Sequence, residues 1–342
     1  MKILITGGCG FVGLNLLCAL ADRDVSEILL VDNLSNSSVE NLDKVIGEID
    51  SLSFVRAADD RWSAERKNGG ALTVRLIQAD IRDAAAMMDC CEGMDTVVNL
   101  AAQSGVPTSL ADPRFDCEQN VMGTFNLLEA CRASKVKTFI TASSAAVLGD
   151  SPPPQSEDQR MLPLSPYGAS KAASEIYCSA YYAAYGLQTL AFRFSNVYGP
   201  YSWRKGSVVA LFIKKLLSGE PVCINGDGSQ RRDFLYVRDL AETLASAATG
   251  QVTDPVPWGQ AVNVSTGVQT SIATLAACLE KEASRTGLPW RTTSAEAREG
   301  DVSASAPSPQ RLKALMPQVT MRRLEEGLPA TVDWFVRETR TN

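Results

Sequence analysis

The feature that most constrains the fold of this 342-residue chain is a glycine-rich turn between an apolar strand and an apolar helix near its amino terminus. The three segments are, in order, Lys2–Thr6, Gly7-x-x-Gly10-x-x-Gly13 and Phe11–Ala21. A second apolar run ends in Asp32, 19 positions after the last glycine. A strand, a glycine loop, a helix and an acid-terminated strand in this order are typical of a parallel sheet that binds a dinucleotide at its carboxyl edge.

Further short β-branched runs alternate with helical patterns through the first half of the chain. The predicted strands after the first are Glu27–Asp32, Thr73–Asp80, Thr96–Leu100 and Thr138–Ser143. Their nearly continuous apolar character indicates a parallel sheet covered on both faces. We therefore predict an α/β fold, a doubly wound Rossmann sheet. Between the second and third strands, the polar stretch 56–70 has no clear period, and we predict a mobile surface excursion there.

The glycine loop suits a pyrophosphate, because glycine lets the backbone approach phosphate oxygens at the positive end of a helix. Asp32 is placed to bind the adenosine ribose hydroxyls, and its charge repels a 2′-phosphate. NAD is therefore favoured over NADP as the cofactor. A glycine turn with a purely structural role is the alternative.

Composition removes several kinds of chemistry. Histidine is absent, which excludes Ser-His-Asp and Cys-His nucleophilic sites and His-ligated metals. Nine cysteines form no C-x-x-C motif, which favours reduced intracellular thiols, a cytoplasmic location and no metal site. The net charge of −6 argues against nucleic acid as a partner. No apolar run reaches the roughly 18 residues of a membrane span, and glycines interrupt the one segment that imitates a signal peptide.

Two further motifs bear hydroxyl and amino groups. Tyr167 and Lys171 lie four residues apart in a predicted helix, Tyr167–Tyr185, so they share one helical face. Lowering a tyrosine pKa from about 10 to about 7 requires roughly 4 kcal/mol, which an ammonium ion and an oxidised nicotinamide ring could supply. Ser143 and Ser144 end the fifth predicted strand, where a hydroxyl can hydrogen-bond a substrate oxygen. The alternatives are a solvated helix edge for the first pair and a turn cap for the serines.

Taken together, the ordered motifs resemble those of extended short-chain dehydrogenase/reductases. The motifs are TGGCGFVG at 6–13, VDNLS at 31–35, DIRD at 80–83, NLAAQ at 99–103, SSAAVLG at 143–149, YGASK at 167–171, RFSNVYGP at 193–200 and GDGSQRRDF at 226–234. The likeness is to the NAD-dependent nucleotide-sugar epimerase/dehydratase group, similar to UDP-glucose 4-epimerases, and runs nearly end to end.

The resemblance implies a role for each matching residue. The catalytic residues would be Ser144, Tyr167 and Lys171. The cofactor would contact Gly7, Gly10, Phe11, Val12, Gly13, Asp32, Asn33, Asp80, Ile81, Ala101, Ala102, Gln103, Tyr167 and Lys171. The nucleotide diphosphate of the sugar would contact Ser144, Asn196, Arg232, Arg298 and Asp301. Two arginines suit a pyrophosphate, because guanidinium groups bond phosphate oxygens in pairs. Without the resemblance, both arginines would be read as ordinary surface charges.

Positions at which this chain differs from the family pattern limit the reactions that it is expected to catalyse. In the related dehydratases and decarboxylases, a carboxylate stands one or two residues after the catalytic Ser/Thr, where this chain has Ala145 and Ala146. Water elimination and decarboxylation are therefore disfavoured. Leu148 and Asn99 replace a usual Tyr and a usual His, and we assign both to packing.

The sequence thus predicts an NAD-dependent epimerase of a nucleotide-diphosphate sugar, acting at C4 of a UDP-hexose through a keto intermediate. A nucleotide-sugar oxidoreductase or dehydratase, or a non-catalytic dinucleotide sensor, remains the alternative. The predicted NAD-binding domain is 1–192, with 236–264 returning to it. The remainder, 193–235 and 265–342, would form a smaller α/β lobe that binds the substrate.

Two further predictions concern the surface of the protein. The helix Tyr167–Tyr185 is apolar or small on more than one face, which predicts packing against its own copy in a homodimer. Arg204 and Lys205 lie in a loop that we expect to be solvated, with binding of a substrate carboxylate such as a uronate as the alternative.

Overall fold

The computed structural model describes residues 1–49, 51–58, 60–65, 70–296 and 304–341. Its main feature is a nine-stranded sheet in the order β13-β8-β7-β6-β1-β2-β5-β4-β3. The strands are β1 (Lys2–Thr6), β2 (Glu27–Asp32), β3 (Val55–Ala58), β4 (Arg61–Glu65), β5 (Ala71–Gln78), β6 (Thr96–Asn99), β7 (Thr138–Ser144), β8 (Gln188–Phe194) and β13 (Gln260–Val264). All neighbours from β13 to β5 are parallel. The predicted Rossmann sheet is confirmed, with strand ends shifted by at most two residues.

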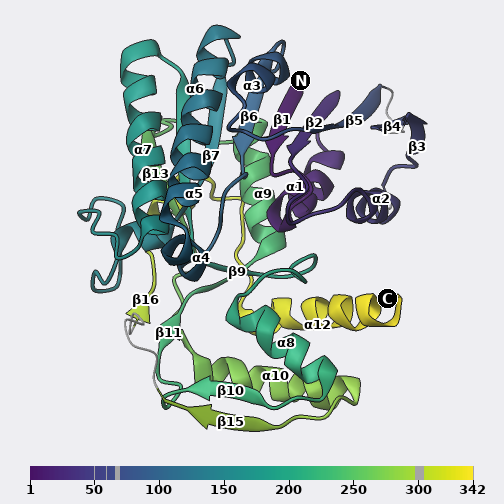
Figure 1. The fold of residues 1–342 in the computed structure, drawn as a ribbon, viewed down its shortest axis with the longest axis vertical. Helices are drawn as coiled ribbons and strands as arrows, with labels where there is room; N and C mark the ends of the chain where they lie inside the picture. Colours follow the sequence, from purple (N-terminus) through teal and green to yellow (C-terminus); the bar gives the residue numbers. More distant parts are fainter. Residues whose placement is uncertain (50, 59, 66–69, 297–303, 342) are drawn as a thin grey trace.

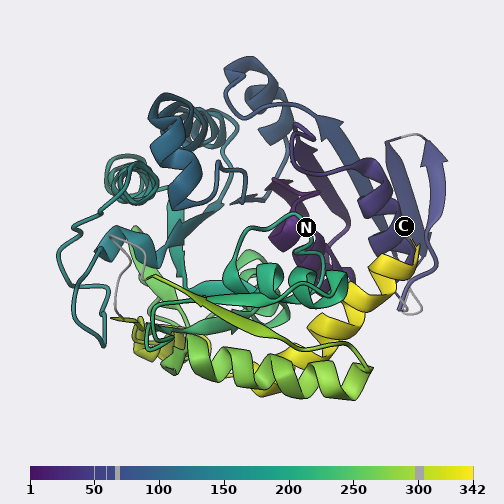
Figure 2. The ribbon, with the colours of Figure 1, turned by 60° about the horizontal axis from the view of Figure 1, so that its bottom comes forward.

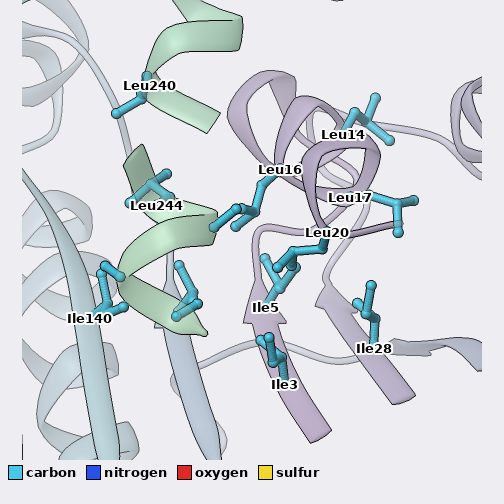
Figure 3. Close-up of a cluster of buried hydrophobic side chains, with 14 of the residues drawn as sticks. Ile3, Ile5, Leu14, Leu16, Leu17, Leu20, Ile28, Ile140, Leu240 and Leu244 are labelled. Atoms are coloured by element: carbon cyan, nitrogen blue, oxygen red, sulfur yellow. The ribbon is translucent and has the colours of Figure 1, made fainter. Parts of the chain in front are cut away.

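Alternate strand residues enter different cores, as a sheet covered on both faces requires. Ile3 and Ile5 of β1 pack with the leucines of α1 (Phe11–Ala21) and α9 (Val237–Ala248), whereas Leu4 faces the opposite layer. Figure 3 shows Leu16 and Leu20 of α1 beside Ile5 and the α9 leucines. The opposite layer contains α3 (Ala84–Cys91), α6 (Gly123–Ala133) and α7 (Pro166–Tyr185), of which Figure 1 shows α6 and α7 as adjacent helices.

The stretch 56–70, which we predicted to be a mobile surface excursion without a clear period, is regular in part: its described residues include most of β3 and all of β4. β3 and β4 pair antiparallel and extend the sheet beyond β5. Trp62 and Ala64 alternate inward and are buried, and the Trp62 Nε1 donates to Asp43 Oδ1 at 3.0 Å. The alternation of buried and exposed residues in β4 was not recognised in the sequence, because charged residues occupy its exposed face. Helix α2 (Val39–Gly47) precedes the hairpin and buries Leu42, Val45 and Ile46.

A second group of elements lies below the sheet in Figure 1. It comprises β9 (Asn196–Tyr198), α8 (Val208–Ser218), β10 (Val222–Asn225), β11 (Arg231–Arg232), β12 (Phe234–Tyr236), β14 (Thr270–Ser271), α10 (Ile272–Thr286), β15 (Thr292–Ala295), β16 (Ala304–Ser305) and α12 (Leu324–Thr341). Its core joins α8, α10 and α12 through Phe212, Leu279 and Phe335. The short helix α11 (Gln310–Leu315) instead packs against β13, and its Leu312 and Leu315 belong to the core of the main sheet. Figure 2 shows α10 and α12 together along one side of this group.

Candidate active site

The site lies at the carboxyl edge of the sheet, where the strand order reverses between β1 and β6. Strands on the two sides of such a switch point lead their loops apart, which leaves a crevice for a ligand. The glycine loop follows β1, the stretch 100–103 follows β6, and Ser144 ends β7. The topology therefore brings the predicted cofactor and catalytic segments to one edge.

The glycine loop is too tight for side chains. Gly7 has φ +66°, and a Cβ there would lie 2.8 Å from the Ala101 nitrogen. A Cβ on Gly13 would lie 2.4 Å from the Gly7 carbonyl oxygen. Gly10 begins α1, whose first turn has neither a side-chain cap nor an acidic residue. The N–H groups of Phe11, Val12 and Gly13 thus begin a helix that needs an external acceptor, and a pyrophosphate is a suitable one.

The Asp32 carboxylate is held rigidly at the end of β2. It accepts hydrogen bonds from the Cys9 and Leu34 nitrogens at 3.0 and 2.9 Å, and from the Ser37 hydroxyl at 2.8 Å. Asn33 reaches the next strand by donating to Asp80 Oδ2 at 3.0 Å. Arg82 also donates to Asp80, which lowers the pKa of that carboxyl to about 2. This arrangement fits the ribose and adenine side of a dinucleotide.

The hollow beside Asp80 has a volume of about 460 Å³ and is lined by Asp80, Arg82, Asp83, Glu118 and Met122. Ile81, in contrast, is buried and faces Gly123, where a Cβ would lie 2.4 Å from the Ile81 Cδ1. A contact from Ile81 to a cofactor would therefore come from its backbone.

The three predicted catalytic residues come together. Tyr167, at the start of α7, lies close to the Ser144 side chain, which lowers the pKa of the tyrosine. The Lys171 Nζ lies 5.9 Å from the centroid of the Tyr167 ring and donates to the Ala142 carbonyl oxygen at 2.9 Å. Pro166 and the Ser165 cap, which accepts from the Gly168 nitrogen at 3.2 Å, start the helix at this point. One face of α7 thus presents both groups to the end of β7.

Burial and two neighbouring side chains act on the pKa of Tyr167. Burial raises the pKa of Tyr167 above its usual value, the Ser144 hydrogen bond lowers it, and Asp116 raises it. Burial also lowers the pKa of Lys171 to about 8, against an opposing effect of Asp116. A positive charge beside the ring, such as that of an oxidised nicotinamide, would oppose the effect of burial on the Tyr167 pKa.

The predicted substrate residues are placed less completely. Asn196 is exposed at the start of β9, and its nitrogen donates to the Asp233 carbonyl oxygen at 2.9 Å. β9 pairs with β12, and Arg232 precedes that strand in β11. Arg298 and Asp301 lie outside the described residues.

Several polar residues of the site were not singled out from the sequence. Asp233 is fully buried and accepts five hydrogen bonds, which come from the Ser195 hydroxyl, the Thr266 nitrogen and hydroxyl, and the nitrogens of Gly267 and Val268. It anchors the strand that carries Arg232. Glu175 and Arg193 form a buried bidentate ion pair at 2.8 and 2.9 Å. Its outer partner is Ser143, which donates to Glu175. Each of these residues bonds to a residue that is distant in the sequence, so no local sequence pattern predicts the contacts.

The structure shows the environment of each residue that differs from the family pattern. Ala145 and Ala146 form a 3₁₀ turn directly after Ser144, so neither position carries an acid or base beside the hydroxyl. Leu148 is fully buried, as the packing prediction requires. Asn99 bridges strand and helix, since its side chain bonds Thr6 and Thr124 at 2.7 and 3.1 Å.

The loop 201–206 is not uniformly solvated. Arg204 is exposed, but Lys205 donates to the Val197 carbonyl oxygen at 3.0 Å, and its Nζ lies 5.0 Å from the Phe11 ring centroid. Burial lowers the pKa of Lys205 to about 8. The expectation of a solvated loop was therefore wrong for Lys205. Within the described residues, no cluster of three metal-ligating side chains occurs, and no helix has the length and apolarity to cross a membrane.

The fold and the Ser–Tyr–Lys site define an enzyme of the extended short-chain dehydrogenase/reductase type. More specifically, the chain belongs to the NAD dependent epimerase/dehydratase family, whose sequence profile matches residues 3–264. Membership of this family confirms the prediction of NAD as the cofactor.

Three similar proteins illustrate the likeness, two of them over almost the whole chain. It is 32% identical to a UDP-glucose 4-epimerase of Mycolicibacterium smegmatis, over 98% of both chains. The dTDP-glucose 4,6-dehydratase of Shigella flexneri is 35% identical over 73% of this chain and 69% of its own length. Among solved structures, the UDP-glucose 4-epimerase of Thermotoga maritima with UDP-glucose superposes with a TM-score of 0.83 at 30% identity, covering 99% of this chain and all of the other.

Proposed function

We propose that this enzyme is a UDP-hexose 4-epimerase that inverts the sugar carbon through a keto intermediate. The observation that carries the proposal is the Ser144–Tyr167–Lys171 group combined with Ala145 and Ala146 after the serine. A hydroxyl proton can be removed and returned by this group, but water elimination lacks its acid and base. The named epimerases among the relatives support the same reading.

The chain's residues would divide the work as follows. NAD, held by the glycine loop and Asp32, supplies an acceptor and donor of hydride when bound. Tyr167 removes the proton of the sugar hydroxyl and later returns it, while Ser144 hydrogen-bonds the same oxygen. Lys171 provides a positive charge beside the phenol ring and favours the phenolate. The proton is returned in each turnover, so the site requires no exit path for it.

We also propose that the unit formed by 193–235 and 265–342 binds the nucleotide diphosphate, with Asn196 and Arg232 as contacts and Asp233 as their anchor. The unit 1–192 together with 236–264 would hold the cofactor. Arg298 and Asp301 remain predicted contacts. The cytoplasmic location likewise remains a prediction from the cysteine usage.

A sugar panel tests the proposed activity. We expect the recombinant enzyme, with NAD in amounts far below the substrate, to interconvert a UDP-hexose and its C4 epimer, followed by NMR across UDP-, TDP- and GDP-sugars. Conversion that stops once the NAD is consumed would indicate a net oxidoreductase. Thermal stabilisation by NAD with no conversion of any sugar would indicate a dinucleotide sensor.

The proposed homodimer is supported by the outer face of α7. Ile176, Tyr177, Tyr182 and Tyr185 are 58, 40, 40 and 59% exposed, an unusual set of large apolar and aromatic side chains on one helix. We expect light scattering at micromolar concentration to give twice the chain mass, and Ile176→Glu to give the chain mass. A wild-type monomer would contradict the proposal.

A further inference from the structure

A half-buried cation, Lys205, lies against the glycine loop and has no role in the function proposed above. It belongs to the loop that joins β9 to α8, in the unit proposed to bind the sugar's nucleotide diphosphate. Its Nζ donates to the Val197 carbonyl oxygen at 3.0 Å and lies 5.0 Å from the centroid of the Phe11 ring. Phe11 is the first residue of α1, so the ammonium group lies beside the helix end that suits the diphosphate of a dinucleotide.

The loop that carries Lys205 is held against α1 by further contacts. Asn15, one turn along α1 from Phe11, is buried, and its Nδ2 donates to the Phe11 and Pro200 carbonyl oxygens at 2.8 and 3.1 Å. From the other side, the Lys214 Nζ of α8 donates to the Lys205 carbonyl oxygen at 3.2 Å. The loop is therefore already in place beside the glycine loop, and a group held in place loses little conformational entropy when it binds a ligand.

No acid neutralises Lys205 within the part of the chain that the structure describes. Its Nζ forms no ion pair there, and its one hydrogen bond goes to the neutral Val197 carbonyl. Burial lowers the pKa of Lys205 to about 8, and no described carboxylate opposes this effect. Withdrawing a cation from water without a counter-ion costs free energy. Holding the Val197 carbonyl needs only a neutral donor, so this contact alone does not account for a positive charge.

We propose that Lys205 is a further cofactor-binding residue, whose ammonium group is the counter-ion of the dinucleotide diphosphate. The glycine loop itself, GGCGFVG at 7–13, offers neutral N–H groups and contains no basic side chain, so the positive charge has to come from another segment. A lysine acts as such a point charge beside the glycine-rich turn of other phosphate-binding loops. The proposal extends the cofactor contacts to the second unit and does not depend on which sugar the enzyme converts.

The nucleotide sugar carries a diphosphate too, and Val197 follows Asn196, a proposed contact of that group. Two observations favour the cofactor. The ring beside the ammonium group belongs to α1, and the Asn15 hydrogen bond fixes the loop to the same helix. Both contacts connect Lys205 to the element that begins at the glycine loop.

The experiment measures the dissociation constant for NAD by calorimetry, with wild type and Lys205→Met freed of bound nucleotide. Methionine keeps an unbranched apolar stem and removes the charge. We expect Lys205→Met to bind NAD about 10- to 100-fold more weakly, the usual loss of a hydrogen bond to a charged group. Lys205→Arg keeps the charge and should bind NAD more tightly than Lys205→Met.

Thermal stability separates this role from a structural one. Removing an uncompensated, half-buried charge should leave the Tm of the NAD-free chain equal to that of the wild type or higher. The rise in Tm that NAD produces should be smaller in Lys205→Met, because a weaker ligand stabilises the folded chain less at the same concentration. A lower Tm without NAD, combined with an unchanged affinity for NAD, would assign Lys205 to loop structure only and overturn the proposal.

Arg204→Met is the matched control. Arg204 is the preceding residue of the same loop and is exposed, so this change also removes one positive charge. We expect its NAD affinity and Tm to match those of the wild type. If Lys205→Met fails to fold, Lys205→Gln removes the charge and keeps an N–H donor for the Val197 carbonyl.

Titration with UDP at saturating NAD tests the other diphosphate. A loss of UDP affinity in Lys205→Met with an unchanged NAD affinity would overturn the assignment to the cofactor. Equal losses of NAD affinity in Lys205→Met and Arg204→Met would overturn it as well, because they would reflect net charge only. Neither titration involves turnover of a sugar, so the results stand whether or not the enzyme epimerises a UDP-hexose.

Discussion

Replacing Tyr167 with phenylalanine is expected to lower kcat for epimerisation by about 10²–10⁴-fold, the usual contribution of one acid–base group. The phenol oxygen is the group that Ser144 hydrogen-bonds and that lies on the same side of α7 as Lys171. Phenylalanine keeps the ring and removes only this oxygen. NAD binding, measured by calorimetry, should therefore remain close to the wild-type value while NMR shows conversion of the sugar nearly lost.

Tyr177→Phe is the control for this loss. Tyr177 lies on the same helix but is 40% exposed and packs edge-on against Phe125, with ring centroids 5.6 Å apart. Removing its hydroxyl should leave kcat unchanged. Near-normal turnover by Tyr167→Phe would eliminate the proposed proton transfer.

The second large effect is expected for stability at the buried ion pair beneath the site. Glu175→Gln should reduce the free energy of unfolding by about 3–5 kcal/mol, because it leaves a buried guanidinium without a counter-charge. The side chains of Arg193 and Glu175 are 3 and 6% exposed, so water cannot replace the lost partner. Chemical denaturation of the two proteins at neutral pH measures the difference.

Glu220→Gln provides the comparison. Glu220 pairs with Lys215 at 3.3 Å on the surface, where the two side chains are 61 and 39% exposed. An exposed pair of this kind contributes about 0–1 kcal/mol. Equal losses in the two variants would mean that burial does not increase the importance of the Glu175–Arg193 pair.

Local pattern was sufficient to predict β1, β2, β5, β6 and β7 and the residues at their carboxyl edge, but β8 and the β3–β4 hairpin were not predicted. The apolar strands and the glycine loop could be predicted because the pattern of each is contained within a few consecutive residues. Strand β4 was not predicted, because its alternation of buried and exposed residues rests on only two buried side chains, Trp62 and Ala64. Helix α2 was likewise not predicted, although Leu42, Val45 and Ile46 are spaced for one helical face.

The buried hydrogen bonds of the site could not be predicted from local sequence patterns. Asn120 meets Gln103 and Ser170 across 17 and 50 residues of chain, and Asp233 meets Thr266 across 33. The amino acid types alone do not show that these side chains are buried. The effect of burial on the Tyr167 pKa was not predicted either, because the depth of a side chain is set by tertiary packing.

The position of β13 and α9 has a consequence for how the protein is made. α9 covers the leucines of α1, and β13 completes the sheet beside β8, yet both are encoded after the segment that leaves for the second unit. A nascent chain therefore carries its amino-terminal helix with one apolar side uncovered until α9, which ends at Ala248, has emerged from the ribosome. Apolar surface that stays uncovered during synthesis is the kind of surface through which incompletely folded chains aggregate.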